Sequence, residues 1–137
     1  MVIVDTSVWI DSLRGTVNPQ TIWLNQALDR EDVGLTSLIL CEVLQGVQSK
    51  SQFRGFQQDL LKFPILDAGS TRVAIASAEN YQILRQKGIT MRRTIDCIIA
   101  TFCIQHAHRL LYKHRDFDAF HTHLGLDVVR VSGSLLH

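Results

Sequence analysis

The sequence predicts an α/β fold in which a doubly wound parallel sheet of about five strands is covered by helices on both faces. Short apolar runs rich in β-branched residues alternate along the chain with longer segments whose apolar residues recur every three or four positions. The chain has 137 residues, of which 46% are hydrophobic, enough for one core and too few for two comfortable domains. We therefore expect a single domain spanning residues 1–137.

The expected strands are short and mostly apolar. The first, at residues 2–4, is apolar on both alternating faces, which is typical of a central parallel strand buried under helices. The run at residues 63–66 follows a polar, amphipathic segment, and its proline favours extended backbone in the residue before it. The expected strands cover residues 2–4, 33–35, 63–66, 109–112 and 128–131.

The expected helices are indicated by their periodicity and by residues that start or stop helices. Pro19 opens one, Thr36 and Ser37 precede one that is apolar nearly all round, Gly88 closes the longest, and Thr94 is expected to cap the last. The expected helices cover residues 8–13, 19–30, 38–47, 49–62, 69–86 and 95–107, and residues 113–120 are expected to form a loop and a short turn.

Composition narrows the class of protein. The formal net charge is +1, from 14 Lys and Arg against 13 Asp and Glu, so any nucleic-acid contact must come from local patches. The start lacks a basic segment and carries Asp5, and the longest apolar run, residues 97–104, is too short to cross a bilayer. We therefore expect a cytoplasmic protein with no membrane partner. Each of the three cysteines lies in apolar sequence and is expected to be a reduced core residue: Cys41, Cys97 and Cys103.

Three acidic residues occupy positions where a carboxylate is expected to be buried. Asp5 ends the first strand, Glu42 interrupts an apolar helix, and Asp96 lies in the first turn of another. Two of them also have an ordinary explanation, because Asp5, like Thr6 and Ser7, can cap a helix, and Asp96 interacts favourably with a helix dipole. Glu42 is harder to explain, since an unpaired carboxylate on a packed helix face would cost several kcal/mol.

The order of strands and helices brings these three acids to one edge of the parallel sheet. Carboxylates about 4 Å apart repel by roughly 4 kcal/mol per pair at an effective dielectric constant of 20, so a cation is needed between them. Oxygen ligands without cysteine or histidine at matching positions favour Mg²⁺ or Mn²⁺. The chemistry this predicts is phosphodiester hydrolysis, in which the cation polarises the phosphate and activates a water molecule.

Four blocks of the sequence together resemble a PIN domain, and in particular the VapC-type toxins of VapBC toxin–antitoxin pairs. They are VIVDTSVWID, LTSLILCEVLQGV, TIDCIIATFCIQHAHRLLYKHRDFDAF and LGLDVVRV. The resemblance implies an α/β/α sandwich and a Mg²⁺-dependent endoribonuclease, usually a homodimer, that a cognate VapB antitoxin inhibits in a heterotetramer or larger complex. It places Asp5, Glu42 and Asp96 on the first three acids of the family, and Thr6 or Ser7 on its supporting hydroxyl position.

The sequence departs from the family at the fourth acid. The family often has an Asp-x-Asp-Phe run after the fourth strand, whereas this chain has His114 at the first position and Asp116 at the third. Either Asp116 alone completes the site, through water, or a second metal site is weakened. We expect Asp116 to be the fourth catalytic and metal-binding acid, and Asp118 to cap the turn that follows.

Basic residues precede two of these acids. Arg92 and Arg93 come just before Asp96, and Lys113 and Arg115 just before Asp116, so both clusters are expected to flank the acidic pocket and to contact RNA phosphates. Such contacts supply affinity without sequence choice. A solvated loop explains each basic residue equally well.

Other protein classes fit less well. A haloacid-dehalogenase-like phosphatase needs a second acid two residues after the first, where this chain has Ser7. A response-regulator receiver needs an acid pair near its start and a phosphoacceptor after its third strand, where Asp67 is a poor substitute. The alternative that stays open is a catalytically weak or silent PIN scaffold that serves as a protein or RNA interaction module, and nuclease assays separate the two.

Overall fold

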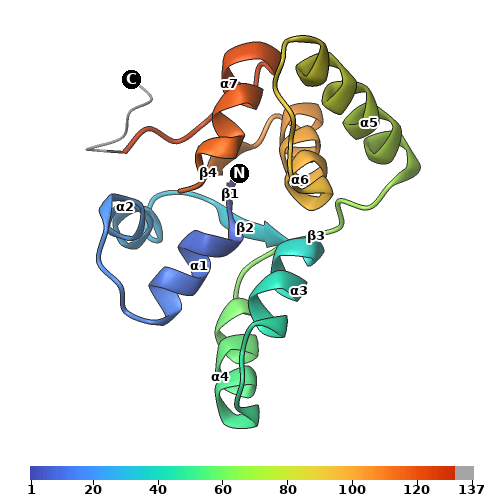
Figure 1. Cartoon of the computed structure of the whole chain (residues 1–137). Helices are drawn as coiled ribbons and strands as arrows, with labels where there is room; N and C mark the ends of the chain where they lie inside the picture. Colours follow the sequence, from blue (N-terminus) through green and yellow to red (C-terminus); the bar gives the residue numbers. More distant parts are fainter. Residues whose placement is uncertain (132–137) are drawn as a thin grey trace.

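A parallel sheet with helices on both sides forms the centre of the computed structural model, which describes residues 1–131 (Figure 1). The sheet has the order β3-β2-β1-β4, with strands β1 (Val2–Val4), β2 (Val33–Thr36), β3 (Ile65–Leu66) and β4 (Arg109–Leu111). In the middle, Ile3 of β1 pairs with Gly34 of β2 and with Leu110 of β4. The predicted α/β/α sandwich is confirmed, with four strands in the described part of the chain.

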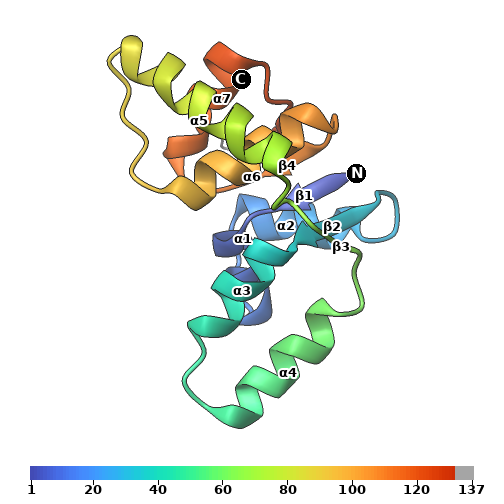
Figure 2. The same cartoon turned by 90° about the vertical axis from the view of Figure 1, so that its right-hand side faces the viewer.

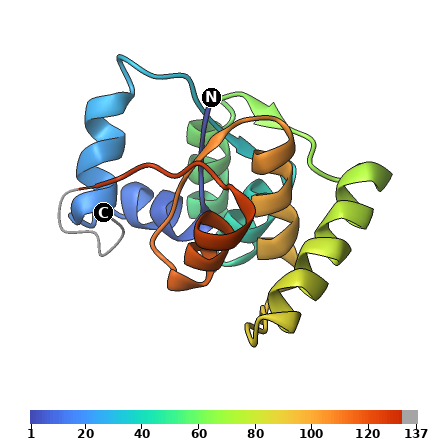
Figure 3. The same cartoon turned by 90° about the horizontal axis from the view of Figure 1, so that it is seen from above.

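The helices lie in two layers. They are α1 (Thr6–Leu13), α2 (Pro19–Ala27), α3 (Ser37–Gln45), α4 (Lys50–Leu60), α5 (Thr71–Gln86), α6 (Thr94–Gln105) and α7 (Asp118–Leu124). Figure 2 shows α5, α6 and α7 on one side of the strands and α1, α3 and α4 on the other. Seen from above, α6 lies between α5 and α7 (Figure 3), and it is buried along most of its length.

The predicted fifth strand, residues 128–131, forms only one isolated parallel bridge, between Leu110 and Val128. The segment is apolar because its side chains pack inward: Val128, Val129 and Val131 are all buried. Its backbone bonds to β4 only at Leu110, whose N–H donates to Asp127 and whose carbonyl accepts from Val129, each at 3.0 Å. Residues 132–137 of the predicted domain lie outside the described part of the chain.

A helix that we did not predict, α7, follows a 3-10 turn, η1 (Arg115–Phe117), where we expected only a loop and a short turn. It has seven residues, and Phe120 is the one it buries. Phe117 and Phe120 are both fully buried, so tertiary packing stabilises a segment whose own propensity is weak. The helix ends at Gly125, whose φ of 79° is a conformation that glycine adopts readily.

The helix starts determine how the predicted site residues are presented. Thr36 caps α3 as expected, because its side chain accepts a hydrogen bond from the N–H of Ile39 at 3.2 Å. Thr94 does not cap α6, since Arg93 occupies the N-cap and Thr94 is already helical. Asp5 occupies the N-cap of α1, but its side chain makes no capping hydrogen bond. A capping hydrogen bond therefore does not account for Asp5, although the N–H groups of Thr6 and Ser7 are near enough to lower its pKa.

The structure also bears on the cysteines and on membrane-spanning helices. Cys97 and Cys103 are buried free thiols, but Cys41 is exposed. The expectation was wrong for Cys41 because α3 buries Ile39 and Val43, and a residue midway between them on a helix faces away from the core. Within residues 1–131, no helix has the length and apolar character needed to span a membrane.

Candidate active site

Asp5 lies at the carboxyl end of the central strand, where β1 leads into α1 (Figure 1). Its side chain is only 3% exposed, and its Oδ1 atom has no hydrogen-bond partner. Burial raises the pKa of Asp5 from 3.8 to about 7, and the negative charges of Asp96 and Glu42 act in the same direction, against the backbone N–H groups of Thr6 and Ser7. A buried carboxylate oxygen without a partner is costly, so this atom points to a ligand that supplies positive charge.

Asp96 is the second buried acid of the site. It lies in the first turn of α6 and is 3% exposed. Burial raises its pKa, and the neighbouring charges of Glu42 and Asp116 add to this, whereas Arg93 and His114 lower it. Asp96 is therefore surrounded by charges from α3 and from the η1 segment, which are far from it in the sequence.

Glu42 of α3 completes a small acidic cavity. Its Oε1 accepts a hydrogen bond from the hydroxyl of Thr6 at 2.7 Å, which fixes the direction of the carboxylate. The cavity has a volume of about 150 Å³ and is lined by Asp5, Thr6, Ser7, Ile10, Glu42, Arg93, Asp96 and His114. Three of the four predicted acids and both predicted hydroxyl residues thus line one cavity.

Asp116 lies in a second cavity that adjoins the first. This cavity, of about 280 Å³, is lined by Arg92, Arg93, Asp96, His114 and Asp116, so that Asp96, Arg93 and His114 line both. An oxygen of Asp116 lies 3.7 Å from the guanidinium of Arg92. The fourth acid therefore borders Asp96 but does not line the cavity that holds Asp5 and Glu42.

Asp118, the other acid of this loop, has a structural partner. The hydroxyl of Tyr112 donates to Asp118 Oδ1 at 2.7 Å. Asp118 begins α7 but makes no capping hydrogen bond, which corrects the expectation that it caps this turn. The bond to Tyr112 joins the segment after β4 to the start of α7.

The four predicted RNA-binding residues do not behave alike. Arg92 and Arg93 are exposed and line the cavity next to Asp116, and Arg115 is exposed in η1. Lys113 instead donates from Nζ to Asp11 Oδ2 at 2.6 Å, on α1. Lys113 and Arg115 line neither cavity, and Lys113 is in addition paired with Asp11, so contact of these residues with RNA stays a prediction.

The donor set of the site suits a hard divalent cation. It is made of carboxylate oxygens, one of them buried without a partner, and such oxygens are ligands for Mg²⁺ and Mn²⁺. As they stand, however, no three His, Cys, Asp or Glu side chains within residues 1–131 are close enough together to hold a metal ion. Glu42 accepts from Thr6 on Oε1 alone, which leaves its second oxygen for a cation, whereas Asp116 faces Arg92 and lines only the adjoining cavity. Binding by all four acids therefore requires Asp116 to turn from Arg92.

The family of the chain follows from comparison with known proteins. Residues 2–121 match the family model described as the PIN domain. The chain belongs to the PIN domain family. This PIN domain is 27% identical over 120 residues to VapC ribonuclease Mb1587 of Mycobacterium bovis and equally to ribonuclease VapC11 of Mycobacterium tuberculosis. Each alignment covers 86% of this chain and 90% of the relative.

Solved structures share the fold of this PIN domain. VapBC2 from Rickettsia felis bound to a promoter DNA fragment matches with a TM-score of 0.76 and 19% identity, over 94% of this chain and 98% of that chain. FitAcB from Neisseria gonorrhoeae matches with a TM-score of 0.72 and 21% identity, over 95% of this chain and 97% of that chain. At these identities the likeness concerns the fold.

Sequence reasoning missed some of what surrounds the acids in this PIN domain. Ile10 lines the acidic cavity four residues after Thr6, and a spacing of four places two residues on the same helix face, so this neighbour could have been found. The hydrogen bond from Lys113 to Asp11, which also accepts from Asn18, had no local signal, because Lys113 follows Asp11 by 102 positions.

Proposed function

We propose that this PIN domain is a metal-dependent endoribonuclease that acts in the cytoplasm as the toxin of a type II toxin–antitoxin pair. The observation that carries the proposal is the burial of Asp5 and Asp96 against one cavity with Glu42, with an oxygen of Asp5 left without a partner. The chain is similar to proteins named ribonucleases over most of its length, which supports RNA as the substrate.

In this proposal Asp5, Glu42 and Asp96 hold Mg²⁺ or Mn²⁺, and Asp116 completes the site from the adjoining cavity. A bound cation of this kind polarises a phosphate and lowers the pKa of a coordinated water molecule. Thr6 keeps Glu42 directed into the cavity through their 2.7 Å hydrogen bond. Arg93 partly balances the charge of Asp96, which lowers the cost of bringing a phosphate to this edge of the sheet.

We propose that the RNA backbone runs past the exposed arginines beside the acids. Arg92 and Arg93 line the cavity that contains Asp116, and Arg115 lies in the same short turn as Asp116. Guanidinium groups bind phosphate oxygens in a bidentate manner and do so whatever the base. Binding is therefore expected to weaken steeply with salt.

We further propose a homodimer that a VapB-like antitoxin neutralises, in a heterotetramer or larger complex. Support comes from the fold neighbours, which include structures described as VapBC and as a toxin–antitoxin complex. Expression of the chain alone should stop bacterial growth, and co-expression of its antitoxin should restore it. Normal growth during expression of active nuclease would contradict the toxin role.

Metal dependence is tested with the purified chain and a labelled single-stranded RNA oligonucleotide of mixed sequence. We expect cleavage with Mg²⁺ or Mn²⁺, none in excess chelator, and recovery when the metal is restored, because the carboxylates alone repel a phosphate. Undiminished cleavage in chelator would contradict the metal site. Cleavage under none of these conditions would favour the silent interaction module instead.

A further inference from the structure

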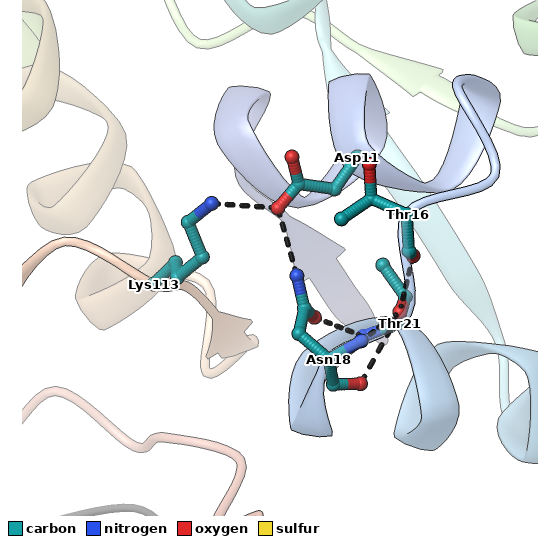
Figure 4. Close-up of polar contacts among 5 residues, drawn as sticks. All are labelled: Asp11, Thr16, Asn18, Thr21 and Lys113. Carbon is teal, nitrogen blue, oxygen red and sulfur yellow. Dashed lines mark hydrogen bonds and ion pairs between the residues drawn. The ribbon is translucent and has the colours of Figure 1, made fainter.

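Lys113 and Asp11 form an ion pair that lies beside the acidic cavities but belongs to neither of their linings. Lys113 Nζ lies 2.6 Å from Asp11 Oδ2, and the two side chains are 41% and 17% exposed. The same oxygen of Asp11 accepts from the side-chain nitrogen of Asn18 at 2.9 Å. Figure 4 shows Lys113 and Asn18 both pointing at the Asp11 carboxylate.

Asp11 is held by a network of hydrogen bonds. Asn18 is the N-cap of α2 and exchanges hydrogen bonds with Thr21: Thr21 N–H donates to Asn18 Oδ1 at 2.9 Å, and Asn18 N–H donates to the Thr21 hydroxyl oxygen at 3.0 Å. The Thr21 hydroxyl also donates to the carbonyl of Thr16 at 2.9 Å (Figure 4). This reciprocal capping fixes the link between α1 and α2, so the Asp11 carboxylate is oriented from two helices.

The other partner, Lys113, begins the segment that carries two residues of the site. It follows β4 and directly precedes His114, which lines both cavities, and Asp116, which lines one of them. At the opposite end of α1, the Asp5 N–H donates to the carbonyl of Leu111 in β4 at 2.9 Å. The helix that begins beside Asp5 is therefore tied twice to the chain that leads to Asp116.

A partly exposed ion pair adds little to the free energy of unfolding. The pair nevertheless orients the carboxylate, because Lys113 and Asn18 donate to the same oxygen of Asp11 at 2.6 and 2.9 Å. Although partial burial raises the pKa of Asp11, these hydrogen bonds hold it below its usual value. The pair also engages one of the three N–H donors of the ammonium group that we predicted from the sequence to contact RNA phosphates.

We propose that Asp11 and Lys113 are positioning residues, whose ion pair fixes residues 113–116 so that Asp116 and His114 face Asp96. The proposal rests on the nuclease function proposed above. In this proposal Lys113 positions Asp116 and so contributes to turnover, and it does not bind RNA.

The test compares Lys113→Met, Asp11→Asn, their double variant and Lys113→Arg. Arg109→Met is the matched control, since Arg109 makes a 2.8 Å ion pair with Glu31 at the other end of β4, with side-chain exposures of 35% and 37%. Amide hydrogen exchange of residues 113–117 is measured first, because it needs no RNA. We expect faster exchange there in Lys113→Met and Asp11→Asn, and no change in Arg109→Met.

Cleavage of the labelled RNA oligonucleotide is then measured over a range of RNA and salt concentrations. Each single variant should lose roughly tenfold in kcat with KM and the salt dependence unchanged, as expected for a misplaced catalytic group. The double variant should be no worse than either single one, and Lys113→Arg should keep most of the activity because it preserves the ion pair.

Several results would overturn the proposal. They are a raised KM and a weaker salt dependence in Lys113→Met with kcat unchanged, no effect of Asp11→Asn on exchange or kcat, or equal losses in Arg109→Met. The first would make Lys113 an RNA contact, and the last would indicate general destabilisation. If the wild-type chain does not cleave RNA, the nuclease proposal fails, while the exchange measurement still decides whether the ion pair fixes the loop.

Discussion

Acidic residues gather at both ends of the parallel strands, but they are buried at the carboxyl end and exposed at the amino end. At the edge where β1 ends, Asp5 and Asp96 are each 3% exposed. At the other edge a cavity of about 260 Å³ is lined by Met1, Val2, Glu31, Asp32, Ala107, Arg109 and Asp127. Its three acids are exposed to water, and Glu31 is paired with Arg109 at 2.8 Å.

The number of carboxylates alone therefore does not define a cation site. Solvent screens the exposed acids at the amino end of the strands, so they need no further partner. At the carboxyl end, burial leaves an oxygen of Asp5 without a hydrogen bond and raises the pKa of both buried aspartates. A bound cation would therefore stabilise the ionised carboxylates more at the carboxyl end than at the amino end.

The largest effect on cleavage is expected from a substitution at the carboxyl end of the strands, tested beside one at the amino end. Asp96→Asn should abolish RNA cleavage while the fold is kept, because it removes a buried ligand and its charge, and the matched Asp32→Asn should cleave like the wild type. Circular dichroism checks the fold, and initial rates check cleavage. Equal activity of Asp96→Asn and wild type would refute the assignment of the site.

The next largest effect concerns how the free energy of unfolding changes with pH in the absence of metal. Below pH 3.8 Asp5 is protonated in both states, and as pH rises to about 7 the unfolded chain loses the proton first, so stability falls. A shift from 3.8 to about 7 corresponds to at most about 4 kcal/mol. Chemical unfolding in chelator should show this decline in the wild type and a smaller one in Asp5→Asn. Parallel pH profiles of the two proteins would contradict it.

A smaller effect separates the two acids of the η1 and α7 segment. Asp116→Ala should lower kcat at least about tenfold, which corresponds to about 1.4 kcal/mol or more of transition-state free energy, because Asp116 borders Asp96. Asp118→Ala should change kcat little, since Asp118 bonds to Tyr112. Steady-state cleavage of the same RNA by both variants decides between them. A greater loss of activity in Asp118→Ala would reverse the assignment.

The smallest expected effect concerns stability alone. Tyr112→Phe removes the hydroxyl that donates to Asp118 at 2.7 Å, which should cost about 1 kcal/mol of unfolding free energy with kcat unchanged. Denaturant unfolding and an activity assay on the same sample measure both quantities. A large loss of kcat without loss of stability would show that Tyr112 acts in the site.

The sequence was informative where its pattern fixes the backbone. Asp5 ends a β-branched run, and Asp96 follows the start of an apolar helix. The parallel order of the strands is enough to bring both acids to the same end of the sheet. The direction of the Glu42 carboxylate depends on a hydrogen bond to Thr6, 36 residues earlier. No local pattern contains that contact.

The same limit explains which features the sequence did not predict. The ion pair of Lys113 with Asp11 on α1 is one of them, because the two residues are 102 positions apart. The α7 helix depends on the burial of Phe117 and Phe120. This burial could not be predicted from a polar segment of seven residues. At residues 128–131, burial could be predicted from three valines, whereas the single backbone bridge could not.

The central claim, that the buried acids at the carboxyl edge hold a divalent cation, is tested most directly by titrating Mn²⁺ at neutral pH. Electron paramagnetic resonance measures free Mn²⁺, and calorimetry in buffers of different ionisation enthalpy counts released protons. We expect the wild type and Asp32→Asn to bind Mn²⁺ alike and to release protons, because the pKa of Asp5 is about 7. Asp96→Asn should bind at least about tenfold more weakly. Equal Mn²⁺ affinity in Asp96→Asn and wild type, or lost binding in Asp32→Asn, would contradict the claim.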